Sequence, residues 1–161
     1  MSNSAEKILY RKAALIFEEL GFLMPRPDGA EASENRVTSA MVPFKGAFSG
    51  YLVISLNDEV LSQLSSNMLG NEQTSTELLR QDSLKEISNV ICGNALPAIY
   101  GFESIFHFDT PIICDAADSI NSDYSEAAQV HLSFDRGNAA ITLFVERNAP
   151  QAFFNCMDRQ K

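Results

Sequence analysis

The chain has 161 residues and a mass of 17.7 kDa, which is enough for one domain with a sizeable core. Its 45% hydrophobic and 20% charged residues exclude a disordered chain, and 11 Phe without any Trp predict a core of aliphatic and phenylalanine side chains. Because 12 Lys and Arg stand against 21 Asp and Glu, the net charge is −9, which argues against nucleic acid or an anionic membrane as a partner.

The sequence also indicates the cellular location of the protein and the state of its cysteines. The sequence holds no run of about 20 apolar residues that would span a membrane, and its first residues lack the basic and apolar parts of a secretory signal. We therefore expect a cytoplasmic protein. The cysteines, Cys92, Cys114 and Cys156, are far apart and form no C-x-x-C pair, so we expect reduced thiols and neither a disulfide framework nor a zinc site.

Hydrophobic periodicity predicts a single α+β domain over residues 1–161. In chain order the patterns predict an N-terminal helix over about 4–21, a hairpin over 37–55, a short helix over 57–70, a long helix over about 75–100, a strand over 104–114, an acidic loop over 115–127, a C-terminal hairpin over about 129–146 and a short helix over 151–157. This order is too irregular for a doubly wound parallel sheet, so we expect a mainly antiparallel sheet packed with helices.

Capping and turn residues predict where these elements end. The expected signals are capping boxes at Asn3 with Glu6 and at Thr74 with Glu77, a cap at Asn57-Asp58, stops at Gly21 and Gly70, and turns at Lys45-Gly46 and Arg136-Gly137-Asn138. Pro97 falls in the last turn of the long helix, and Pro111 favours an edge position for the strand over 104–114.

The long helix carries two opposite faces. At about 100° per residue, the side predicted to be buried consists of Leu84, Ile87, Ile91, Ala95 and Ala98. The side almost opposite consists of Asp82, Glu86, Asn89 and Gly93. Asn and Gly cost a helix up to about 1 kcal/mol each relative to Ala, so something other than helix stability is needed to explain them. A glycine beside an amide lets another macromolecule approach the helix closely, which describes a docking surface more than a pocket.

The pattern Asp82-x-x-x-Glu86-x-x-Asn89-x-x-x-Gly93 resembles the active-site helix of the CheC, CheX and FliY phosphatases of bacterial chemotaxis. The segments SNVICGNAL and FHFDTPIIC are similar to that family's motif helix and the strand after it. An E-x-x-N pair alone is expected by chance, whereas the extended pattern has a chance expectation of about 0.01. One motif per chain resembles CheX, whose chains form homodimers, and differs from CheC, which carries two.

The resemblance implies a function and a role for each residue. It implies a phosphatase that removes the phosphoryl group from the aspartate of a phosphorylated CheY-like response regulator. Asn89 would orient the attacking water, Glu86 would pair with the receiver's active-site lysine, and Asp82 and Gly93 would contact the partner. No cofactor is expected on this chain, because the Mg²⁺ belongs to the partner receiver domain. A homodimer is also implied.

Plainer interpretations exist for several of these residues. Residues such as Glu86 and Asn89 are also common on a solvated helix face, although the wider resemblance favours a function for them. Cys92 has no base placed near it, so we expect an inert thiol. His107 and His131 lack a third metal ligand, and the acidic residues Asp115, Asp118, Asp123 and Glu126 lack the order of a calcium loop. The residues Phe102, Phe106, Phe108, Phe134 and Phe144 are candidates for the core or a dimer interface.

Three functions from different classes remain open on the sequence. The first is the response-regulator phosphatase. The second is a non-catalytic receiver-binding module of the same fold, which would use the Glu86 and Asn89 face without hydrolysis. The third, which the lack of a second domain disfavours, is a structural partner in a flagellar or sensory complex.

Overall fold

The computed structural model describes residues 4–26, 36–70, 76–114 and 122–147, and it has the predicted α+β fold with a mainly antiparallel sheet. Its elements, in chain order, are α1 (Ser4–Gly21), β1 (Val37–Gly46), β2 (Gly50–Asn57), α2 (Asp58–Leu69), α3 (Glu77–Tyr100), β3 (Phe106–Phe108), β4 (Ile112–Cys114), β5 (Tyr124–Phe134) and β6 (Gly137–Glu146). The short helix expected over 151–157 lies outside the described residues.

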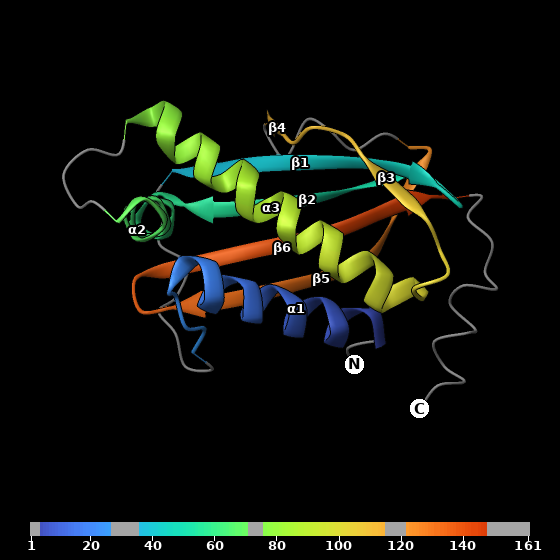
Figure 1. The fold of residues 1–161 in the computed structure, drawn as a ribbon, viewed down its shortest axis with the longest axis horizontal. Helices are drawn as coiled ribbons and strands as arrows, with labels where there is room; N and C mark the ends of the chain where they lie inside the picture. The colour runs from blue at the N-terminus through green and yellow to red at the C-terminus, as the bar shows by residue number, and fades with distance from the viewer. Residues whose placement is uncertain (1–3, 27–35, 71–75, 115–121, 148–161) are drawn as a thin grey trace.

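The strands form one six-stranded sheet in which every pairing is antiparallel. Its order is β3-β1-β2-β6-β5, and β4 pairs with β1 beside β3. Figure 1 shows α1 and α3 lying across one face of this sheet, with α2 at one end of it. The main core fills the space between the helices and the sheet, so the opposite side of α3 faces away from the sheet.

The hairpin of β1 and β2 buries the predicted residues, but its turn lies at a different position from the predicted one. Alternate residues of β1 and β2 are buried against the helices, as their period of two predicts. The turn expected at Lys45-Gly46 is wrong, because Gly46 is the last residue of β1 and the turn occupies residues 47–49. Gly46 has a φ of 155°, and a Cβ there would lie 2.2 Å from the Ile105 carbonyl oxygen, so the approach of the segment before β3 requires a glycine.

The strand expected over 104–114 is two strands. β3 and β4 both pair with β1, but residues 109–111 between them leave the ladder. Pro111 has no N–H to donate, and the Asp109 N–H donates to the Pro43 carbonyl oxygen at 2.9 Å. The sequence predicted one continuous edge strand through Pro111. Its position at the edge of the sheet is confirmed, but the prediction of a single unbroken strand is wrong.

The acidic loop expected over 115–127 ends earlier than predicted. Residues 115–121 lie outside the described part of the chain, and β5 already begins at Tyr124. The Tyr124 ring packs against Tyr51 on the sheet face away from the helices, with 5.1 Å between ring centroids. This cross-strand contact extends the strand into a segment whose acidic residues resemble a loop.

The C-terminal hairpin shows the predicted alternation, since Val130, Leu132 and Phe134 are all buried. Its turn is Asp135-Arg136, one residue earlier than expected, and Gly137 already belongs to β6. A Cβ at Gly137 would lie 2.2 Å from the Asn57 side-chain oxygen, so the start of β6 is fitted around the residue before α2.

Helix ends follow the predicted residues only in part. Gly70 closes α2 in the left-handed conformation as expected. Gly21 is instead the last residue of α1, and Phe22 takes the left-handed conformation with a φ of 51°. Asn57 precedes α2, but its side chain does not cap the helix, because its oxygen accepts the Asn138 N–H at 3.3 Å. The capping residue Asn3 lies outside the described part of the chain.

Within the described residues, no helix is long and apolar enough to cross a membrane.

Candidate functional site on the exposed side of the long helix

Helix α3 begins two residues later than the capping box predicted. Its N-cap is Thr76, whose side-chain oxygen accepts the Leu79 N–H at 3.2 Å, and Glu77 follows in the first turn. The predicted cap, Thr74, lies outside the described residues. The hydroxyl satisfies one of the free N–H groups at the start of the helix, and the carboxylate complements the positive end of the helix dipole. The helix continues through Pro97 to Tyr100.

The buried side of α3 fixes the orientation of the helix. Four of its five predicted members, Leu84, Ile87, Ile91 and Ala95, are buried in the main core. The fifth, Ala98, is only partly buried, because Leu96, Ile99 and Tyr100 take the buried side in the last turn. This side leaves α3 little freedom to rotate, since turning it would expose several large apolar side chains.

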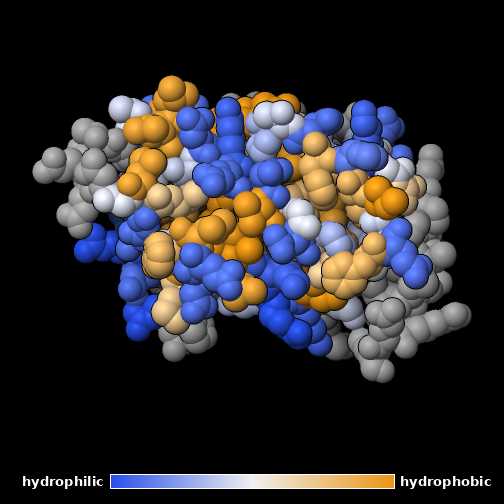
Figure 2. Space-filling view, in the orientation of Figure 1, coloured by the Kyte–Doolittle hydropathy of each residue, from blue (hydrophilic) through white to orange (hydrophobic). Residues whose placement is uncertain are grey.

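The predicted outward residues lie on the exposed side of the same helix. Asp82, Glu86 and Asn89 are exposed, and Gly93 is partly exposed. Glu86 and Asn89 are about 4.5 Å apart along the helix axis, at about 1.5 Å per residue. In Figure 2 the middle of α3 presents hydrophilic atoms on the face turned away from the sheet. The structure therefore brings the carboxylate and the amide to one exposed ridge, within one helical turn of each other. We call Asp82, Glu86, Asn89 and Gly93 the ridge residues.

The fold makes no internal use of these polar groups. Among the residues that the structure describes, the side chains of Asp82, Glu86 and Asn89 have no ion pair or hydrogen bond to the rest of the chain. Asn94, one residue after Gly93, differs, because its amide nitrogen donates to the Val90 carbonyl oxygen at 2.7 Å. The Asn89 amide thus keeps both its acceptor and its donors available to another molecule.

Gly93 is a helical glycine that the chain does not need for its own packing. A Cβ at this position would meet nothing within 4 Å, so an alanine would fit without a clash. Glycine in a helix interior is less favourable than alanine by about 1 kcal/mol. The residue therefore leaves bare helix backbone beside Asn89 without any benefit to the isolated fold.

Cys92 is not available for nucleophilic chemistry. It is fully buried on the inner side of α3, and burial raises the pKa of its thiol well above the ordinary value. A protonated, inaccessible thiol is neither a nucleophile nor a metal ligand. The expectation of an inert thiol agrees with this environment.

Other candidate sites are not assembled in the described residues. His107 and His131 are exposed, and the described part of the chain contains no group of three or more side chains that would hold a metal ion. Asp115 and Asp118 lie outside that part.

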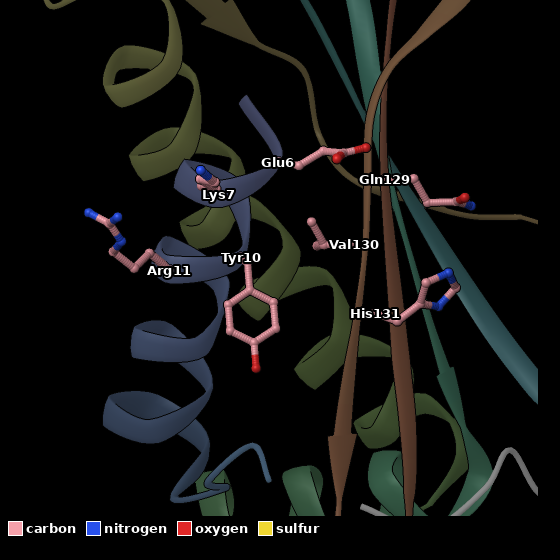
Figure 3. A pocket seen from close by; sticks show the side chains of 7 residues that line it. All are labelled: Glu6, Lys7, Tyr10, Arg11, Gln129, Val130 and His131. Carbon is pink, nitrogen blue, oxygen red and sulfur yellow. The ribbon is translucent and has the colours of Figure 1, made fainter. Parts of the chain in front are cut away.

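A cavity of about 420 Å³ lies between α1 and β5, lined by residues that include Tyr10 and His131. Figure 3 shows the Tyr10 ring in the gap between the helix and the strand. None of the ridge residues lines this cavity.

The loop after α3 holds an exposed aromatic side chain. Phe102 was expected in the core or at a dimer interface, and because 87% of it is exposed, it is not a core residue. Ile105, in the same loop, is 71% exposed. Gly101, which ends the helix with a φ of 97°, is the sequence signal that would have separated this loop from the buried elements on either side.

Comparisons with known proteins identify the family of the chain. The chain matches the family described as chemotaxis phosphatase CheX over residues 38–135, which is more than half of its length and includes all four ridge residues. No curated protein sequence matches the chain.

Solved structures with the same fold have low sequence identity to this chain. The CheX structure from Desulfovibrio desulfuricans has a TM-score of 0.70 and 16% identity, and the match covers 88% of this chain and 99% of that one. The CheX–CheY–BeF3–Mg complex from Borrelia burgdorferi gives 0.66 and 14%, covering 88% and 97%. FliY from Thermotoga maritima gives 0.62 and 11%, covering 97% and 94%. These likenesses establish the fold.

Proposed function

We propose, because this chain belongs to the CheX family of chemotaxis phosphatases, that it accelerates the loss of phosphate from the aspartyl phosphate of a CheY-type response regulator. One observation carries the proposal: Glu86 and Asn89 lie within one turn on the exposed side of α3, with no partner among the described residues of their own chain. The CheX–CheY complex among the solved structures of this fold supports a receiver as the partner.

Asn89 is proposed to position the attacking water. An acyl phosphate is already labile, so a helper protein gains most by holding a water in line with the phosphorus atom. The Asn89 amide oxygen accepts a hydrogen bond from that water without itself changing charge. The water oxygen then bonds to phosphorus as the bond from phosphorus to the aspartyl oxygen breaks. The protons of the water stay on the inorganic phosphate or pass to the solvent. The receiver recovers a free aspartate.

Glu86 is proposed to set the register between the two proteins. Its carboxylate would pair with the lysine of the receiver's active site. Asn89, one turn further along the helix, would contact the water. An ion pair that loses its water on binding confers orientation and specificity more than net affinity. Asp82, a further turn away, is proposed to contact the partner at the edge of the same interface, and Gly93 is proposed to let the partner approach the helix closely.

The catalytic centre would then be shared between two proteins. We propose that this chain binds no cofactor and that the Mg²⁺ needed to neutralise the phosphoryl oxygens is held by the receiver. The chain alone would be inactive toward small phosphate esters, because the metal and the lysine would be missing.

The proposal is tested by following phosphate release from a purified receiver phosphorylated with acetyl phosphate. Adding this protein with Mg²⁺ should shorten the lifetime of the aspartyl phosphate, and the effect should saturate with protein concentration. Unchanged lifetime together with tight binding to the phosphorylated receiver would replace the phosphatase with the non-catalytic binding module. Absence of both effects with every CheY-type receiver of the same cell would reject both functions.

We also propose a homodimer. In the described sheet β5 forms one edge and β3 and β4 form the other, so the outer edge of β5 presents backbone groups that another strand is able to pair with. The Arg26 N–H already donates to the Ser133 carbonyl oxygen at 2.7 Å, which occupies the end of that edge. Sedimentation equilibrium tests the proposal, and a single species of about 17.7 kDa at all concentrations would contradict it.

A further inference from the structure

The two halves of α3 differ sharply in charge. The first ten residues of the helix, 77–86, carry five charged side chains, and Glu86 is the last of them. The segment 87–102 that follows contains no Asp, Glu, Lys, Arg or His. Asn89 and Gly93 therefore lie in an uncharged segment that ends at Phe102, one residue before the exposed Glu103 in the loop after the helix.

That loop holds two large apolar side chains in solvent. Phe102 is 87% exposed and Ile105 is 71% exposed, although Tyr100 and Phe106 on either side pack into the aromatic cluster around Phe48. Isolated exposed apolar residues are common, but two in one short loop next to a candidate interface call for a partner. Figure 2 shows hydrophobic atoms over the end of α3 and the segment leading to β3, on the same face as the hydrophilic atoms of α3.

The loop is shaped before any partner arrives. The Gly101 N–H donates to the Pro97 carbonyl oxygen at 2.8 Å, and the Ser104 N–H donates to the Gly101 carbonyl oxygen at 3.2 Å. The Ser104 hydroxyl also donates to the Tyr100 carbonyl oxygen at 3.2 Å. A turn fixed by these bonds presents its apolar side chains at little further cost in conformational entropy on binding.

We infer that the receiver docks over the C-terminal half of α3, with its closest approach to the helix at Gly93 and with Phe102 and Ile105 buried against an apolar patch on the receiver. We call these three residues the C-terminal docking surface. The inference rests on the proposed function, since it names the contacts that place Glu86 and Asn89 in the receiver's active site.

The net charge of the chain indicates that binding to the receiver depends on short-range apolar contacts. A chain with a net charge of −9 repels an acidic receiver active site at long range, so the attraction has to come from short-range contacts. Bare backbone at Gly93 permits such contacts, because a partner segment reaches the helix without a side chain in between. Apolar anchors beside a polar catalytic pair supply affinity while the pair supplies register.

Two variants and a matched control test the inference. The substitutions are Gly93→Ala and Phe102→Ser, and the control is Leu78→Ser, which removes an apolar side chain that is 66% exposed at the charged end of the same helix. Each protein is titrated against a CheY-type receiver loaded with beryllofluoride and Mg²⁺, and its rate of phosphate release is measured over a range of phosphorylated receiver concentrations.

The expected result is a split between binding and turnover. Phe102→Ser should raise Kd and KM by about tenfold to hundredfold, as expected for one large apolar anchor, and leave kcat unchanged. Gly93→Ala should raise both by about tenfold, although it should raise the Tm of the free protein through higher helix propensity. A merely structural glycine would instead lower the Tm when replaced. Leu78→Ser should bind as the unchanged protein does.

The possible contradictions are distinct. If the unchanged protein hydrolyses the phosphoreceiver and both variants match it in KM, the docking surface is wrong while the proposed function stands. If the unchanged protein binds without hydrolysis, the proposed phosphatase fails and the Kd values still decide the docking surface. If Phe102→Ser dissociates a dimer and leaves receiver binding intact, a second copy covers the loop and the inference is wrong.

Discussion

Glu86 and Asn89 are exposed within one turn of α3, while Ile87 and Ile91, which alternate with them along the helix, are fully buried. The buried pair locks the rotation of the helix, and that rotation determines where the carboxylate and the amide point. Catalytic geometry on a helix held by its own core is more exact than geometry on a loop, because the side chains start from a fixed backbone.

Asn89→Ala should lower kcat by at least about a hundredfold, because the water would lose its positioning acceptor. The Kd for the beryllofluoride-loaded receiver should change little, since a neutral amide at the reacting centre contributes mainly to the transition state. The matched control is Asn94→Ala, whose amide is bonded within its own helix. Phosphate release by Asn89→Ala at the unchanged rate would remove the residue from the mechanism.

Glu86→Ala should weaken binding, because truncating one member of a desolvated ion pair leaves the other charge without its partner. The expected loss is about 2 kcal/mol or more, which is roughly a 30-fold rise in Kd. Isothermal titration against the loaded receiver measures it. Glu18→Ala, at an exposed position on α1, controls for the change in net charge. Equal affinities for the two variants would contradict the pairing with a receiver lysine.

Periodicity alone was enough to predict the two sides of α3. A long helix against a sheet has one repeating requirement, which is to bury every third or fourth side chain, and the residues from Leu84 to Ala95 meet it. The same reasoning predicted the buried alternation of β5 from Val130 to Phe134. The roles of the outward residues stay predictions, because a solvated face has no packing requirement that the fold reveals.

Turns and loop side chains were harder to predict because distant contacts determine them. Gly46 resembles a turn residue in the sequence, yet it belongs to β1 and is a glycine because the Ile105 carbonyl lies where a Cβ would be, and no local pattern contains that contact. Phe102 is an apolar residue of the kind usually found in a core, yet the turn that begins at Gly101 places it in solvent. Its aromatic neighbours Tyr100 and Phe106 pack against Phe48. Local sequence specifies which elements form, and tertiary contacts specify where they stop.

Buried Cys92 predicts how stability depends on pH. Its thiol has a raised pKa in the folded protein, so the folded state holds the proton more tightly than the unfolded chain, whose thiol has the ordinary value of 9.0. The stabilisation is therefore complete below about pH 9 and is lost as the pH rises above it, when the unfolded chain releases its proton and the folded protein does not. Urea unfolding between pH 7.5 and 10 measures this fall.

The matched variants for this prediction are Cys92→Ala and Cys114→Ala. The first should make the fall of stability above pH 9 shallower, although Tyr100, whose pKa is also raised by burial, leaves part of it at the alkaline end. The second should leave the fall unchanged, because Cys114 is only partly buried. Identical pH profiles for all three proteins would show that the Cys92 thiol titrates alike in both states.

Gly137→Ala and Gly93→Ala are expected to change stability in opposite directions. A Cβ at Gly137 would lie 2.2 Å from the Asn57 side-chain oxygen and 2.5 Å from its nitrogen, so the Asn57 amide would have to move. That movement would also disturb its bond to the Asn138 N–H. Crowding of this kind costs about 1–3 kcal/mol. Gly93→Ala meets no atom and should gain up to about 1 kcal/mol. Urea midpoints of the two variants, compared at equal slopes, measure both changes. Gly137→Ala that unfolds at the midpoint of the unchanged protein would show that the end of the β5–β6 hairpin is not fitted around Asn57.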